Sequence, residues 1–141
     1  MKPEEIFQRF EKSLAEFLKA DRVLLEVNAN ERAISHKLAE HIQDQFLNWN
    51  VDCEYNRVEF DPKKVNGKLV NPDIIVHHRK TPDNLLVVEV KKSNNKISIL
   101  KDIERLKNFT KDNLVYKAGI LVVLEKESHT QLKFLNGQKV Q

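Results

Sequence analysis

Residues 72–92, PDIIVHHRKTPDNLLVVEVKK, contain the features from which the fold of this chain can be predicted. Two apolar runs stand on either side of a short Lys-Thr-Pro-Asp-Asn turn at residues 80–84. Turn residues between apolar runs predict an antiparallel hairpin, here with strands at residues 73–79 and 85–92. Both runs are apolar at successive positions, which is typical of strands that are buried on both faces. The hairpin is therefore expected in the middle of a sheet that helices cover on each side.

The rest of the chain supplies helices and further strands for such a sheet. Apolar residues recur at three- and four-residue steps in three segments, which predicts amphipathic helices at residues 3–20, 31–49 and 98–113. Strands are expected at residues 51–60, 119–124 and 131–135, the last at the edge of the sheet. Residues 21–27 are apolar but too few for periodicity to distinguish helix from strand. This order of elements predicts an α/β fold with a central sheet between helices.

Size and composition are those of one globular domain. The chain has 141 residues, of which 40% are hydrophobic and 32% charged, as in ordinary globular proteins. No apolar run approaches the roughly 20 residues that a membrane-spanning helix needs, so no membrane partner is expected. The N-terminus, MKPEEIFQRF, has acidic residues where a signal peptide would be basic and then apolar, so we expect a cytoplasmic protein. The single cysteine, Cys53, excludes an internal disulfide and a thiolate zinc cluster.

Basic residues are clustered although their overall excess is small. The net charge of +3 does not by itself indicate nucleic-acid binding. The clusters lie in one loop and at two strand ends: Lys63, Lys64 and Lys68; Arg79 and Lys80; and Lys91, Lys92 and Lys96. They could form a basic rim for a phosphate backbone, and scattered solvated lysines are an equally good explanation.

Ionisable residues interrupt the apolar hairpin at its open end. Asp73 begins one predicted strand, and Glu89 and Lys91 end the other on a common face of the sheet. With the turn centred near Pro82, Asp73 pairs with Lys91 and Ile75 with Glu89, so the three charged residues converge. Two buried carboxylates repel one another, and a lysine relieves only part of this repulsion. A hard cation, Mg²⁺ or Mn²⁺, is therefore expected between Asp73 and Glu89.

Such an ion would serve phosphodiester hydrolysis. It would lower the pKa of an attacking water and stabilise charge on the phosphate in the transition state. Lys91 would position or deprotonate that water, or neutralise the phosphate. Asp102, expected in the first turn of the third helix, is explained by the helix dipole instead.

Glu31 is a fourth candidate, from the second predicted helix. It lies on the apolar face of that helix, three residues before Ile34 and seven before Leu38, and so should point inward. It could be a further metal ligand, directly or through water. The alternative is a capping box, Asn28-x-x-Glu31, in which Glu31 reaches back to a backbone amide; Asn28 and Asn30 are both good N-cap residues.

At these positions the sequence resembles the PD-(D/E)XK nuclease superfamily. The matching residues are Pro72-Asp73 and, sixteen residues beyond Asp73, Glu89-Val90-Lys91, with Glu31 on the preceding helix. With Asn30-Glu31-Arg32 through His36, the pattern is similar to that of an uncharacterised prokaryotic group in the superfamily. The resemblance implies a restriction-endonuclease-like three-layer sandwich with a mixed central sheet. Its core would cover about residues 29–125, within a single domain, and the helix at residues 3–20 would be an N-terminal addition.

The resemblance also implies a function. It implies an endonuclease that uses Mg²⁺ or Mn²⁺ to hydrolyse nucleic acid, DNA first of all, with Asp73, Glu89 and Glu31 as metal ligands and Lys91 as the water-activating residue. So small a domain would gain recognition surface as a homodimer or within a larger defence or repair complex. Some members of the superfamily lack activity, so the alternative is an inactive nucleic-acid-binding or assembly domain on the same fold. A third explanation is that Glu89 and Lys91 are merely the exposed end of a strand in an unrelated α/β domain.

Overall fold

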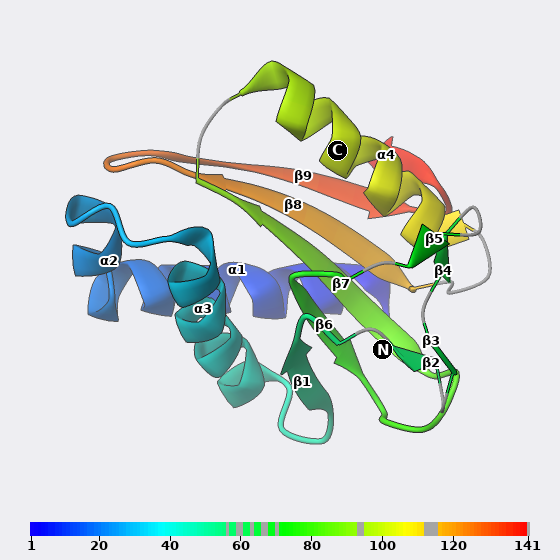
Figure 1. The fold of residues 1–141 in the computed structure, drawn as a ribbon. Helices are drawn as coiled ribbons and strands as arrows, with labels where there is room; N and C mark the ends of the chain where they lie inside the picture. The colour runs from blue at the N-terminus through cyan, green and yellow to red at the C-terminus, as the bar shows by residue number, and fades with distance from the viewer. Residues whose placement is uncertain are drawn as a thin grey trace.

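A six-stranded mixed sheet forms the centre of the protein, with helices on both faces (Figure 1). The computed structural model describes residues 1–55, 71–92, 95–111 and 116–140, and between residues 56 and 70 only the backbone of four short strands. The helices are α1 (Pro3–Ala20), α2 (Val23–Glu26), α3 (Glu31–Gln45) and α4 (Lys96–Lys111). The large sheet has the order β1 (Asn50–Cys53), β6 (Ile74–His77), β7 (Asn84–Lys91), β8 (Ala118–Leu124), β9 (His129–Leu135) and β10 (Gln138–Val140). Two small sheets pair β2 (Arg57–Val58) with β3 (Asp61–Pro62), and β4 (Lys64–Val65) with β5 (Lys68–Leu69).

The two faces of the sheet pack against different helices. In β6, β7 and β8, even-numbered residues such as Ile74 and Val88 join α1 and α3 in the larger hydrophobic cluster. Odd-numbered residues of these strands, such as Ile75 and Val87, join α4 in a smaller one. Because side chains alternate along a strand, runs that are apolar at every position supply both clusters. The predicted α/β class, with a mixed sheet flanked by helices, is confirmed.

Helix α1 has the bounds that its apolar spacing predicts. Pro3 occupies its first turn, where a missing backbone N–H costs nothing, and Glu4 and Glu5 favourably meet the positive end of the helix dipole. Its apolar stripe is fully part of the larger cluster: Ile6, Phe7, Phe10, Leu14 and Phe17. The helix therefore packs on the sheet together with α3.

The central hairpin forms as predicted, but its register differs from the expected one. Ile75 pairs with Val87, not with Glu89, and Ile74 pairs with Val88. The difference arises at the turn, where β6 ends at His77 in a register shift and Lys80 adopts a positive φ of 63°. Because the difference is two residues, every side chain keeps its predicted face. The observed register brings Asp73 next to Glu89.

Other boundaries also differ from those expected. Helix α3 ends at Gln45, and residues 21–27 contain the short helix α2. Strand β1 stops at Cys53, before Glu54 at a φ of 52°. Strand β9 is not the edge, because a tight turn at Asn136-Gly137, both with positive φ, returns the chain as β10.

The described members of the basic clusters lie at opposite ends of the hairpin. Arg79 and Lys80 lie in the β6–β7 turn, at the end of the hairpin opposite to Lys91 and Lys92. Arg79 is hydrogen-bonded there to both carboxylate oxygens of Asp52. Lys63 and the side chains of Lys64 and Lys68 lie outside the described residues.

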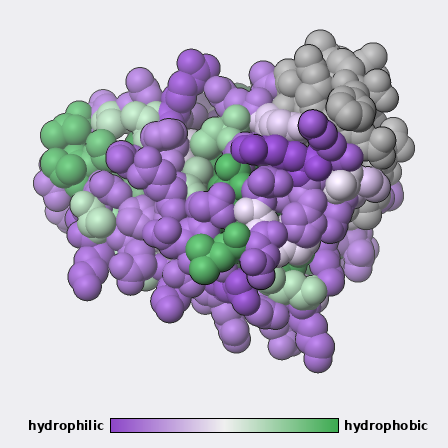
Figure 2. All heavy atoms as spheres, turned by 90° about the horizontal axis from the view of Figure 1, so that it is seen from below, coloured by the Kyte–Doolittle hydropathy of each residue, from purple (hydrophilic) through white to green (hydrophobic). Residues whose placement is uncertain are grey.

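The described surface shows no broad apolar face in the view from below. That view is mainly hydrophilic, with small, separate hydrophobic areas (Figure 2). Among the described residues, no helix has both the length and the apolar character needed to cross a bilayer.

Candidate functional site

Asp73 and Glu89 meet at the open end of the β6–β7 hairpin. Asp73 immediately precedes β6, and its Oδ2 accepts a hydrogen bond of 2.8 Å from the backbone N–H of Val90. Glu89 lies in β7 on the face that α4 covers, and it is only 1% exposed. The two carboxyl groups are close enough for each to shift the pKa of the other. Three of the four predicted site residues, Asp73, Glu89 and Lys91, therefore lie at one end of the sheet.

Burial makes it unfavourable to ionise both carboxyl groups. Desolvation raises the pKa of Glu89 well above its ordinary value, and the negative charge of Asp73 raises it further. Desolvation also raises the pKa of Asp73, although the hydrogen bond from Val90 opposes that rise. Without a metal ion the pair is therefore biased to keep a proton, although the charge of Arg105 lowers the pKa of Glu89 in part.

Helix α4 adds two charged residues to this cluster. Oδ2 of Asp102 lies 3.2 Å from Nζ of Lys91. Nη2 of Arg105 lies 3.3 Å from Oε1 of Glu89, and its Nη1 lies 3.9 Å from Oδ1 of Asp102. Lys91 and Arg105 therefore supply positive charge to three acidic side chains. These five residues form the charged cluster: Asp73, Glu89, Asp102, Lys91 and Arg105.

The expected role of Asp102 is wrong. Because α4 begins at Lys96, Asp102 lies beyond its first turn, which contains no acidic residue. Asp102 is 6% exposed and is paired with Lys91, so it faces the sheet rather than the end of its helix.

The sequence motif does not include Arg105. The available signal is its spacing, because Asp102 and Arg105 each stand four residues before a buried apolar residue, Leu106 and Phe109. Charged residues on the buried face of a helix require partners, and here those partners are Lys91 and Glu89.

Glu31 reaches this end of the sheet from the first turn of α3. The N-cap is Asn30, whose side chain accepts a hydrogen bond from the N–H of Ala33. Oε2 of Glu31 instead accepts a 3.0 Å hydrogen bond from the backbone N–H of Lys92, directly after β7. The Asn28-x-x-Glu31 capping box is therefore wrong.

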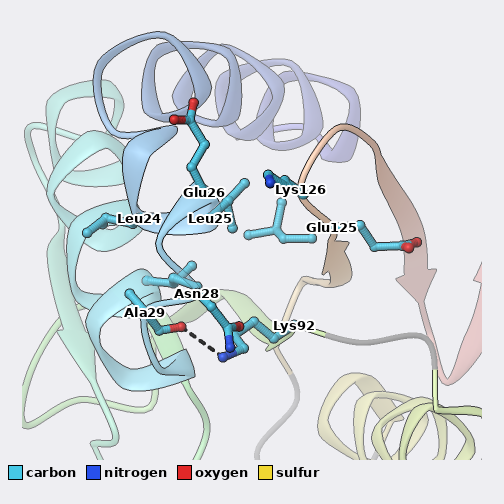
Figure 3. Close-up of a pocket in the computed structure, with 10 residues that line it drawn as sticks. Leu24, Leu25, Glu26, Asn28, Ala29, Lys92, Glu125 and Lys126 are labelled. Atoms are coloured by element: carbon cyan, nitrogen blue, oxygen red, sulfur yellow. Dashed lines mark hydrogen bonds between the residues drawn. The ribbon is translucent and has the colours of Figure 1, made fainter.

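Lys92 connects the start of α3 to the end of β7 through two hydrogen bonds. Besides its backbone bond to Glu31, its Nζ donates a 3.0 Å hydrogen bond to the carbonyl oxygen of Ala29, drawn as a dashed line in Figure 3. These two bonds hold Glu31 beside the end of β7.

Two cavities lie near the start of α3, and Glu31 lines one of them. One, of about 440 Å³, is lined by Glu31 and Asp73 together with residues of α3 and the end of β1. The other, of about 320 Å³, lies between α2, Lys92 and the end of β8, with Leu25 and Ile34 among its apolar lining residues (Figure 3). Glu31 and Asp73 thus share an opening to solvent, whereas Glu89 and Lys91 face α4.

The donor set of the carboxylate pair fits a hard divalent cation. Oε1 of Glu89 is buried without a hydrogen bond among the described residues, although Arg105 lies nearby. In the described part of the chain, no three or more His, Cys, Asp and Glu side chains are arranged to hold a metal ion. One or two carboxylates suffice for Mg²⁺, because water and substrate phosphate complete its octahedral shell. Asp73 and Glu89 meet that requirement.

Comparisons with known proteins identify no family. The chain matches no protein-family model and no curated protein. A solved structure titled "Crystal structure of SSO0001" aligns with 89% of this chain and 74% of that chain, at 21% sequence identity and a TM-score of 0.38.

Proposed function

We propose that this protein is a metal-dependent nuclease with a restriction-endonuclease-like fold, which hydrolyses phosphodiester bonds in nucleic acid, DNA first of all. One observation carries the proposal: two carboxyl groups whose burial opposes ionisation, Asp73 and Glu89, lie together with Lys91 at the open end of a hairpin. Such an arrangement is costly for stability alone and suits the binding of a cation.

Each residue has a distinct part in this proposal. Asp73 and Glu89 would hold Mg²⁺ or Mn²⁺, which would supply water activation and stabilise charge on the phosphate. Lys91, with its amine held beside Asp102, orients the attacking water or neutralises the phosphate. Glu31, held against Lys92, contributes a further carboxylate, through water, from the opposite layer of the fold.

The element order supports the fold assignment. Apart from the short strands β2 to β5, the chain order from residue 31 to residue 124 is helix α3, the sheet strands β1, β6 and β7, helix α4 and the sheet strand β8. The Glu-x-Lys pair lies on β7, a strand buried by helices on both faces.

The experiment combines metal binding with cleavage. Calorimetry with Mn²⁺ should show binding to the wild type and its loss in Asp73→Asn and Glu89→Gln. Incubation with plasmid, single-stranded DNA, RNA and branched DNA in Mg²⁺ or Mn²⁺ should show cleavage of at least one substrate. Lys91→Ala should lower cleavage by about a hundredfold or more while preserving metal binding. Glu104→Gln is the matched control, because Glu104 is a 71%-exposed carboxylate on α4.

The alternative outcomes are separable. Absence of both metal binding and cleavage would reject the proposal, and undiminished cleavage by Asp73→Asn and Glu89→Gln would reject the assigned site. Metal binding without cleavage would favour the inactive binding domain. One observation already favours that second function, because Arg105 supplies Glu89 with a positive charge from the protein itself.

A further inference from the structure

Arg105 extends from α4 across the buried carboxylate of Glu89. Its Nη2 donates a 3.4 Å hydrogen bond to the carbonyl oxygen of Asn71 and lies 3.3 Å from Oε1 of Glu89. The guanidinium carbon is 5.8 Å from the centre of the Phe109 ring, which lies beneath it. The side chain therefore spans the strip between the start of β6 and the end of β7.

The hydrogen-bonding capacity of Arg105 is largely unused by the described residues. A guanidinium has five N–H donors in a planar fork. The contact with Glu89 lacks hydrogen-bond geometry, since Oε1 of Glu89 has no hydrogen bond, and the 3.9 Å separation from Asp102 is too long for one. Arg79 provides the contrast, because its Nε and Nη2 bond to both carboxylate oxygens of Asp52.

Exposure distinguishes Arg105 from the other cation of the cluster. The side chain of Arg105 is 38% exposed, whereas that of Lys91 is 16% exposed. A polyanion approaching the three acidic residues of the cluster would be repelled by them and would meet Arg105 first.

We infer that Arg105 binds a backbone phosphate of the substrate, and that it exchanges its contact with Glu89 for that phosphate when nucleic acid arrives. The planar fork matches two phosphate oxygens, and a charge-assisted pair of N–H bonds would replace one long ion-pair contact. Glu89, which would then lose its cation from the protein, faces the position of the proposed metal ion. This inference rests on the proposed function for its ligand class, nucleic-acid backbone, and adds a binding residue outside the Asp73, Glu89 and Lys91 motif.

The test measures binding in EDTA, where cleavage and metal binding cannot contribute. Affinity for a labelled DNA duplex is measured over a series of salt concentrations for the full chain and its variants. Arg105→Gln should weaken binding by about tenfold and reduce the slope of log affinity against log salt by about one phosphate contact. Arg105→Lys should keep that slope but bind about threefold more weakly, since it retains the charge and loses the fork.

Lys107→Gln is the matched control. Lys107 lies on the same helix with a similarly exposed side chain, at 40%, but two residues further along, so it points away from Arg105. It should leave the affinity and the salt slope within experimental error of the wild type.

The outcomes separate this inference from the proposed function. Wild-type affinity and slope in Arg105→Gln, or an absence of nucleic-acid binding by the wild type, would overturn the inference. Reduced slope in a protein that neither binds Mn²⁺ nor cleaves would support the inference and reject the nuclease. Circular dichroism verifies that each variant folds. If Arg105→Gln does not fold, Arg105→Lys decides the question. Wild-type affinity in Arg105→Lys would then overturn the inference, and threefold weaker binding would support it.

Discussion

Glu89 carries a carboxyl group into one of the most enclosed positions of the sheet. Its side chain is 2% exposed, and the oxygen nearest to Arg105 makes no hydrogen bond with the described residues. An unsatisfied buried group of this kind lowers stability by about 1–3 kcal/mol, so Glu89 weakens the fold that contains it. This is the cost expected where a side chain is kept for binding rather than for folding.

Replacing Glu89 with glutamine should stabilise the metal-free protein. The pKa of Glu89 is raised in the folded state, so protonated Glu89 contributes to folding stability. This contribution is complete below the ordinary glutamate pKa and is lost as pH rises through the pKa of the folded state. The metal-free wild type should therefore lose stability as pH increases through this window. Glu89→Gln should lose less stability over the same pH range. At pH ~8 its free energy of unfolding in urea should exceed that of the metal-free wild type by about 1–3 kcal/mol. Glu104→Gln should follow the wild-type profile; an identical profile for Glu89→Gln would show that Glu89 is not held in its neutral form.

The site residues differ in how far the sequence could predict them. The local sequence pattern is sufficient to predict Asp73, Glu89 and Lys91 as site residues, because these charged residues interrupt apolar strands. The apolar spacing places Asp102 in the wrong helical turn, because α4 begins two residues earlier than that spacing indicates. The spacing of Arg105 places it on the buried face of its helix, but its pairing with Glu89 depends on which strand the helix packs against, and only tertiary structure decides that.

Helix α4 packs closely on strand β8 at Gly119. A Cβ atom there would lie 3.1 Å from Cγ2 of Thr110 and 3.2 Å from Cδ2 of Leu106. Both atoms belong to buried side chains of α4 and have little room to move. The absence of a side chain at Gly119 therefore sets the distance between the helix and the sheet.

Gly119→Ala should destabilise the protein by about 1–3 kcal/mol, because overpacking forces α4 away from β8. Urea unfolding of Gly119→Ala measures this loss directly. Lys117→Ala, at an exposed position just before the same strand, should change stability by no more than about 0.5 kcal/mol. Equal stabilities of the two variants would mean that the helix adjusts without cost.

The elements themselves were predictable to different extents. Long periodic segments such as α1 were located to the residue, and apolar runs located β7 and β8 closely. The hairpin register was not, because the irregularity between Val76 and His77 has no sequence signal of its own. Strand β10 is not among the predicted strands, although Asn136-Gly137 is a strong hairpin-turn dipeptide.

At the scale of the whole molecule, the N-terminal helix α1 supplies a large part of the hydrophobic core. The family resemblance places α1 outside the catalytic core, at residues 3–20, yet its apolar stripe belongs to the larger hydrophobic cluster. The apolar pattern of the sequence predicts the layers, so it also predicts the α/β class. It does not predict how many side chains each helix contributes to the core, because that depends on packing between helices far apart in the chain.

Removal of residues 1–20 should leave a chain that does not unfold cooperatively. Loss of the five buried apolar side chains of α1, at about 2–5 kcal/mol each, would cost roughly 10–25 kcal/mol, which is comparable to or larger than the usual 5–15 kcal/mol stability of a domain. The single variant Phe10→Ala should already cost about 3–5 kcal/mol, whereas Leu47→Ala, at a 78%-exposed residue, should be nearly neutral. Thermal and urea unfolding monitored by circular dichroism measure all three. A truncated protein with a sharp transition would show that the remaining layers are self-sufficient.

The turn between β6 and β7 lies at the end of the hairpin opposite to Asp73 and Glu89. A fluorophore or a linker to a solid support attached there would leave the carboxylates unobstructed. Cys53 is the only cysteine, so Pro82→Cys combined with Cys53→Ser provides a unique point of attachment on an exposed residue. Immobilised through that point, the protein would present its acidic end to the medium in a uniform orientation.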